Sequence, residues 1–249
     1  MSNQSLILSS VVDGVLQLTF NRPEQRNALN GEMYVQLAEL IAVATADSAV
    51  RIIVLQGGNG YFTAGNDLAD FVPVPAELLA MRLFRAVAAC DKPIIAAVEG
   101  GAIGIGTTIL GHVDFAFAGA STRFAAPFVK LGVCAEGASS LLLPQSAGYK
   151  LAASILLLGE QFTAQTALSA GLLTAVVDDG QALAKALETA SRLSAMPLDV
   201  LQTNKRLLKS HQLPAILKQL DDEEARFMEL LGKEPAKKAI SGFLAARKK

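Results

Sequence analysis

Cysteine and histidine are both scarce in this chain of 249 residues, which contains only two of each. The chain has no CxxC pair and no cluster of histidine and cysteine, so the sequence indicates neither a zinc site nor a disulfide framework. Two isolated cysteines, Cys90 and Cys134, are typical of a reducing compartment. The sequence therefore predicts a protein without a bound metal.

An excess of charge of either sign is also lacking. The 22 basic and 23 acidic residues give a net charge of −1, so no global field would attract nucleic acid or an anionic membrane. The longest stretch without a charged residue, 161–177, contains glutamine, threonine and serine and makes a poor membrane span. The first ten residues lack the basic start of a signal peptide. We expect a cytoplasmic protein without nucleic-acid or membrane partners.

Apolar residues are abundant instead. They make up 51% of the chain, charged residues make up 18%, and the mean hydropathy is +0.38. A chain of this length and composition can bury a large core and can cover further apolar surface in an oligomer. The composition excludes an intrinsically disordered protein.

The first part of the chain alternates between strand and helix patterns. Residues 6–11 and 15–20 are rich in β-forming residues and meet at Asp13-Gly14, which predicts a hairpin. Helical spacing follows at residues 31–47 and 75–90, and short apolar strands are predicted at 51–56, 93–98 and 113–118. Strand, glycine-rich turn and helix in succession indicate an α/β fold with parallel strands.

The last part of the chain shows only helical patterns. Helices are predicted at residues 181–195, 198–210, 213–231 and 236–247. Pro197, Pro214 and Pro235 lie at the starts of the last three, where proline is tolerated. The sequence therefore predicts two parts, an α/β core over residues 1–195 and a helical C-terminal region over residues 196–249.

Two glycine-containing loops follow predicted strands directly, at residues 61–68 and 99–106. Glycine permits positive φ and close approach of a ligand, and a helix starting near Ile105 would leave its first N–H groups unpaired. Backbone N–H donors of this kind can hold the oxyanion of a thioester that becomes an enolate. The alternative is that the glycines only permit tight turns and close helix packing. Neither loop has the ending of a phosphate-binding loop.

Several motifs occur in the order and spacing of the crotonase (enoyl-CoA hydratase/isomerase) family, and the chain resembles that family over roughly residues 6–205. The resemblance rests on the segments Asn21-Arg22-Pro23, Arg26-Asn27-Ala28-Leu29, Phe62-Thr63-Ala64-Gly65-Asn66-Asp67-Leu68, Gly100 to Gly106, Asp114, Thr163-Ala164-Gln165 and Ala170-Gly171-Leu172. It implies a crotonase-like β-β-α spiral core, an acyl-CoA thioester substrate and a homotrimer or hexamer. No separate cofactor is expected, since coenzyme A is part of the substrate.

The resemblance also implies roles for individual residues. Ala64 and Ile105 would supply the two N–H groups of the oxyanion hole. The other substrate-binding positions would be Arg26 and Ala28, near the adenine nucleotide, together with Asn66, Asp67, Leu68 and Gly104. Weaker candidates for coenzyme A contacts are Phe243, Arg247 and Lys248. The C-terminal region would serve in oligomerisation and as a lid.

The acid/base residues distinguish the reactions of this family. The two positions that match the glutamates of the hydratases are Thr108 and Phe128, and neither can act as a base at neutral pH. Glu136 lies among small and apolar residues in a segment that resembles the one carrying the single base of the peroxisomal-type Δ3,Δ2-enoyl-CoA isomerases, although Ala135 replaces a proline there. The alternative for Glu136 is a carboxylate at a helix N-terminus.

The sequence therefore predicts an isomerase that converts a 3-enoyl-CoA to a trans-2-enoyl-CoA through a dienolate, in the degradation of fatty acids or related acyl-CoA compounds. One base suffices for this proton shift, whereas hydration needs a second group to orient water. Two alternatives remain. The chain could be an enoyl-CoA hydratase or another crotonase-family enzyme, or a homologue that binds acyl-CoA without catalysis.

Overall fold

The computed structural model describes residues 5–246 and contains two β-sheets. The larger sheet has six strands in the order β1-β2-β3-β4-β6-β9. These strands are β1 (Ile7–Val12), β2 (Val15–Phe20), β3 (Ile52–Gly57), β4 (Ile94–Val98), β6 (Phe115–Gly119) and β9 (Ala175–Val177). The strands β1 and β2 form an antiparallel hairpin, and every later neighbour is parallel. At the hairpin turn, Asp13 and Gly14 both have positive φ, as predicted for a tight turn.

A smaller sheet consists of β5 (Gly101–Ile103), β7 (Arg123–Ala125) and β8 (Phe162–Thr163). The chain passes from β4 to β5 and into helix α3 (Ile105–Thr108), and then from β6 to β7 and onward to helix α4 (Ser139–Ala147). Each cycle thus adds one strand to the large sheet and one to the small sheet before a helix follows. This is the β-β-α arrangement that the family resemblance implied.

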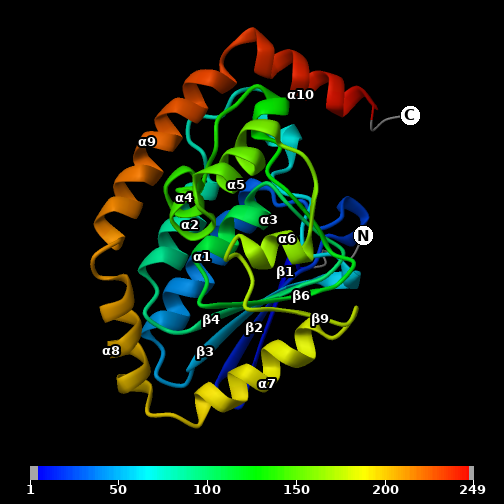
Figure 1. Ribbon diagram of the computed structural model, residues 1–249. Coiled ribbons are helices and arrows are strands. Elements are labelled where there is room, and N and C mark those ends of the chain that lie inside the picture. Colours follow the sequence, from blue (N-terminus) through cyan, green and yellow to red (C-terminus); the bar gives the residue numbers. More distant parts are fainter. Residues whose placement is uncertain (1–4, 247–249) are drawn as a thin grey trace.

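Helices cover both faces of the large sheet. Helices α1 (Gly31–Ala46) and α2 (Ala80–Ala89) lie on one side, and α7 (Ala182–Ser194) lies on the other (Figure 1). Side chains of β3 alternate accordingly, since Ile53 and Leu55 join the core on the α1 side and Ile52 and Val54 join the core beneath α7. A sheet buried on both faces needs apolar strands throughout, as the sequence has.

The helical C-terminal region wraps one edge of the molecule (Figure 1). It comprises α8 (Leu198–Lys209), α9 (Leu213–Leu231) and α10 (Glu234–Ala246). Helix α9 packs against α2 and α4, and α10 packs on the 3-10 turns Leu68–Phe71 and Phe128–Leu131. Helix α8 is held by the buried Lys205, whose Nζ donates to Asp114 at 2.7 Å. The partly buried Asp114 is therefore paired with the C-terminal region.

The structure also differs from the sequence prediction. The helix expected over residues 75–90 begins only at Ala80, because Pro73 and Pro75 precede a stretch that stays irregular. The helix expected after Gly104 is a single turn. Short helical elements that the patterns did not reveal include α5 (Tyr149–Ala153), α6 (Ala164–Ser169), the 3-10 turns Pro23–Gln25, Gly58–Gly60 and Ile109–Gly111, and the π-helical turn Ser154–Leu158. Within residues 5–246, no helix combines the length and apolarity of a bilayer span.

Candidate active site

Three chain segments run side by side where the glycine loops leave the strands. Thr63 forms a parallel bridge with Ala102, and Asn66 forms a parallel bridge with Leu29. The N–H of Asp67 donates to the carbonyl of Leu29 at 2.8 Å, which fixes the backbone around Asn66. Counted from the bridge between residues 63 and 102, Asn66 and Ile105 occupy equivalent positions in the two loops.

Glycine is required where these loops meet. Gly65 has a φ of 91°, and a Cβ at this position would lie 2.7 Å from the carbonyl oxygen of Ile103. Gly104 has a φ of 56°, and it directly precedes the first residue of α3. Both positions have a positive φ, which side chains disfavour, and at Gly65 a side chain would also clash with the neighbouring loop. The glycines therefore bring the two loops into contact.

The buried Asn27 links the turn around Arg26 to the start of the first glycine loop. Its Oδ1 accepts from the backbone N–H of Arg22 at 2.9 Å, and its Nδ2 donates to the carbonyls of Gly58 and Tyr61. Arg26 and Asn27 both have positive φ, so the turn is tight. This turn leaves the Arg26 guanidinium over the ring of Tyr61, 5.9 Å from its centroid.

Most backbone N–H groups of the first loop already have acceptors. That of Ala64 donates to the carbonyl of Arg26 at 2.9 Å, that of Gly65 to Oγ1 of Thr63 at 3.0 Å, and that of Asp67 to Leu29. The N–H of Asn66 has no acceptor among residues 5–246. The prediction that Ala64 supplies a free donor is thus corrected to Asn66, because the Ala64 N–H is used in holding the Arg26 turn.

The second loop offers a matching donor. The N–H of Gly104 donates to the carbonyl of Ala125 at 2.8 Å, and those of Thr107 and Thr108 donate back to Gly104. Ile105 opens helix α3, and in the described part of the chain its N–H meets no acceptor. A free N–H at this position agrees with the role expected for Ile105. Two unpaired donors, of Asn66 and Ile105, thus stand at equivalent positions of adjoining loops.

Glu136 is a fully buried carboxyl group beside these donors. It precedes α4, and both of its carboxyl oxygens lie 3.3 Å from Nδ2 of Asn66. Burial raises the pKa of Glu136 to about 8; the hydrogen bond from Asn66 opposes this rise, and the carboxylate of Glu223 adds to it. A carboxyl group with such a pKa can both accept and return a proton near neutral pH.

The segment that carries Glu136 is anchored from helix α9. The carboxylate of Glu223 accepts from the backbone N–H groups of Ala138 at 2.6 Å and Ser140 at 3.0 Å, and also from the Ser140 hydroxyl. These N–H groups belong to the N-terminal turn of α4, where a carboxylate is favoured by the helix dipole. The capping carboxylate, considered as an alternative for Glu136, is thus supplied by Glu223.

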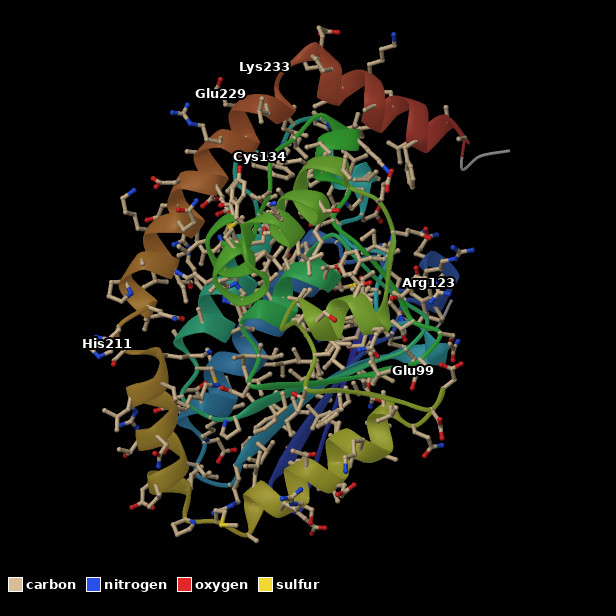
Figure 2. The ribbon with its side chains drawn as sticks, viewed as in Figure 1. Glu99, Arg123, Cys134, His211, Glu229 and Lys233 are labelled. Atoms are coloured by element: carbon tan, nitrogen blue, oxygen red, sulfur yellow. The ribbon has the colours of Figure 1, made fainter. Side chains whose placement is uncertain are left out.

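Two further residues of this region have structural roles. His112 is buried, its Nε2 lies 2.7 Å from the carbonyl oxygen of Gly137, and burial lowers its pKa to about 4. Burial, with the nearby Glu223, raises the pKa of Cys134 to about 11, so its thiol is no nucleophile at neutral pH. Figure 2 shows Cys134 beside α9, where its Sγ lies 3.7 Å from the carbonyl oxygen of Glu223.

A cavity of about 830 Å³ opens in front of the two loops. Among the predicted residues it is lined by Arg26, Ala28, Ala64, Asn66, Leu68, Gly104, Phe128 and Phe243. Asp67 lines a second, smaller cavity instead, and its carboxylate pairs with Arg22 at 2.6 Å and accepts from the N–H of Ala69. The candidates Arg247 and Lys248 lie outside the described residues.

A second cavity of about 360 Å³ shares Asn66 and Phe71 with the first, and it extends between α1 and the start of α2. Glu136 lines neither cavity and lies behind the Asn66 amide. The hydratase position Thr108 is buried, with its Oγ1 3.4 Å from the Gly104 carbonyl oxygen, and it does not line the larger cavity either. The site residues that the sequence did not reveal are Tyr34, Lys130 and Glu223.

Comparison with known proteins identifies the family. The sequence profile of the enoyl-CoA hydratase/isomerase family matches residues 11–249. The chain is 36% identical to 1,2-epoxyphenylacetyl-CoA isomerase of Escherichia coli (strain K12), covering 97% of this chain and 96% of that protein. It is 35% identical to 2,3-dehydroadipyl-CoA hydratase of the same organism, covering 94% and 93%. Its identity to peroxisomal enoyl-CoA delta isomerase 3 of Mus musculus is 30%, covering 98% and 79%.

A solved structure agrees with these relatives. The enoyl-CoA hydratase/isomerase from Pseudoalteromonas atlantica T6c superimposes with a TM-score of 0.92 at 36% identity, covering 97% of this chain and 98% of that one. The predicted crotonase-like α/β fold is thereby confirmed. The relatives include both isomerases and hydratases, so the comparison identifies the family but not which of these reactions the chain catalyses. The chain belongs to the enoyl-CoA hydratase/isomerase family, the crotonase family.

Proposed function

We propose that the chain is a Δ3,Δ2-enoyl-CoA isomerase in which Glu136 is the only acid/base group. The observation that carries this proposal is the position of one buried carboxyl group, with a pKa near 8, against the residue whose backbone N–H is free. This arrangement suits a reaction in which the carboxyl group removes a proton from carbon. The unpaired N–H then stabilises the negative charge that develops on the thioester oxygen.

The reaction follows from these groups. The ionised Glu136 removes a proton from C2 of the 3-enoyl-CoA, and the electrons delocalise into a dienolate whose oxygen accepts from the N–H groups of Asn66 and Ile105. The protonated Glu136 then gives the proton back at C4, which leaves the double bond between C2 and C3. Donors that already point at the developing oxyanion need no reorganisation during the reaction.

The two cavities suit the two ends of an acyl-CoA. The larger cavity carries two cationic side chains, Arg26 and Lys130, which suit the phosphates of coenzyme A. The smaller cavity combines the apolar side chains of Leu29, Phe71 and Leu78 with the carboxyl groups of Glu32, Asp67, Asp70 and Glu77, and its apolar part suits the acyl chain. Both cavities are lined by Asn66, whose amide donates to Glu136, so an acyl chain that passes from one to the other runs beside this amide, one side chain away from the carboxyl group.

Hydration is the second candidate, since one of the relatives is named a hydratase. It requires a base for water and a second acid, and the two hydratase positions hold Thr108 and Phe128. Within the described residues, the larger cavity is lined by a single carboxylate, that of the exposed Glu24. Of the four carboxylates that line the smaller cavity, Asp67 pairs with Arg22 and Asp70 accepts from the N–H of Gly31. These side chains favour isomerisation over hydration.

The assay is the conversion of a 3-enoyl-CoA to the conjugated 2-enoyl-CoA, monitored by absorbance. We expect turnover in this assay and negligible hydration of a 2-enoyl-CoA. Rapid hydration without isomerisation would identify a hydratase, and tight binding of both compounds without turnover would identify a non-catalytic homologue. The homotrimer or hexamer, the cytoplasmic location and the oligomerisation and lid roles of residues 196–249 stay predictions.

A further inference from the structure

The side chain of Asn66 is held in one orientation by Tyr34. This tyrosine lies on α1, its side chain is buried, and its hydroxyl donates to Oδ1 of Asn66 at 2.5 Å. An amide whose oxygen is engaged on one side presents its NH2 group on the other, where it reaches both carboxyl oxygens of Glu136. The three side chains form a line from helix α1 to the loop before α4.

The same asparagine contributes its backbone to the other half of the site. Its N–H is the free donor of the first loop, and the bridge to Leu29 fixes the backbone at this point. The distance between the oxyanion donor and the acid/base group is therefore set within one residue. An alanine at position 66 would keep the backbone donor but lose the contact with Glu136.

We propose that Tyr34 and Asn66 are positioning residues that orient the carboxyl group of Glu136 and favour its ionised form. This inference rests on the proposed function of Glu136 as the base. Asn66 supplies a hydrogen bond to the carboxylate, and Tyr34 keeps the amide from rotating its oxygen toward it, which would place two acceptors face to face.

The groups that face Glu136 come from several elements. They are Tyr34 from α1, Asn66 from the first loop, Glu223 from α9 and Cys134 from its own segment. The carboxyl groups of Asp67 and Asp70 lie near Tyr34 and do not act on Glu136 directly. Asn66 is the one group that lowers the pKa of Glu136, whereas burial and Glu223 raise it. Loss of the Asn66 amide therefore raises the pKa of Glu136 further.

Two variants and two matched controls test this inference. Asn66→Ala removes the amide, and Tyr34→Phe removes only the hydroxyl; Asn204→Ala and Tyr149→Phe make the same changes at exposed positions. The measurement is kcat and KM for a 3-enoyl-CoA as a function of pH. We expect the acidic limb of kcat to move to higher pH in Asn66→Ala and by less in Tyr34→Phe, while both controls match the parent. Each whole pH unit of movement lowers kcat on that limb about tenfold.

An infrared titration of the Glu136 carboxyl band, identified by its loss in Glu136→Gln, separates this inference from the proposed function. A band that titrates at higher pH in both variants supports the inference even if the parent fails to isomerise 3-enoyl-CoA, a result that would overturn the proposed function alone. If Asn66→Ala matched the parent in both the acidic limb of its kcat profile and the titration of the Glu136 carboxyl band, the positioning role of Asn66 would be overturned. A Tyr34→Phe profile that matches Tyr149→Phe would overturn that of Tyr34.

Discussion

Replacement of Glu136 by glutamine should stabilise the folded chain at neutral and alkaline pH. Burial raises the pKa of this carboxyl group from 4.5 to about 8. Between these two values the unfolded chain is ionised while the folded chain still holds the proton, so the free energy of unfolding falls as the pH rises. Above the folded pKa the full cost of an ionised, buried carboxylate is present, and it amounts to roughly 4–5 kcal/mol.

A glutamine at this position does not titrate, and it keeps the shape of the side chain. The difference in unfolding free energy between Glu136→Gln and the parent should be small near pH 4.5 and should grow until about pH 8. Denaturant unfolding followed by circular dichroism, at a fixed protein concentration and over a series of pH values, measures this difference.

Glu188→Gln is the matched control. Glu188 is exposed, and the hydrogen bond from Lys185 lowers its pKa, so any pH-linked change has the opposite sign. Parallel stability curves for Glu136→Gln and the parent would show that Glu136 does not carry a raised pKa. They would refute the electrostatic part of the reasoning.

Three further changes test individual contacts. Gly65→Ala should lower the unfolding free energy more than Gly180→Ala does, because both have positive φ but only Gly65 faces a backbone oxygen at 2.7 Å; equal losses in denaturant unfolding would contradict this. Glu223→Ala should cost about 1–3 kcal/mol and lower kcat, since α4 loses its acceptor; an unchanged kcat in the absorbance assay would argue against the anchoring role. Lys130→Ala should raise the KM for acyl-CoA at constant kcat, with Lys150→Ala as a neutral control; equal KM values would remove Lys130 from the phosphate contacts.

Features that depend on neighbouring residues in the sequence could be predicted. The hairpin at Asp13-Gly14, the helix over residues 31–47 and the C-terminal helices all follow from local spacing and turn residues. Glu136 could be singled out because small and apolar residues surround it, and its burial agrees with that environment. The short strands β7, β8 and β9 escaped prediction because two or three residues show no periodicity.

Features that depend on contacts between distant segments could not be predicted. Whether Ala64 or Asn66 offers a free N–H is decided by a hydrogen bond to Arg26 in another segment. Tyr34 and Glu223 approach Glu136 from α1 and α9, and nothing near them in the sequence marks them. Only the packing of the elements brings these side chains together.

The isomerase activity of Glu136→Gln tests the central claim most directly. The variant keeps the shape of the site and both backbone donors but cannot transfer a proton, so kcat with a 3-enoyl-CoA should fall by roughly 10²–10⁴. Affinity for the acyl-CoA, measured by calorimetric titration, should stay close to that of the parent. A folded Glu136→Gln variant that isomerises 3-enoyl-CoA at the parent rate would contradict the account and place the base elsewhere.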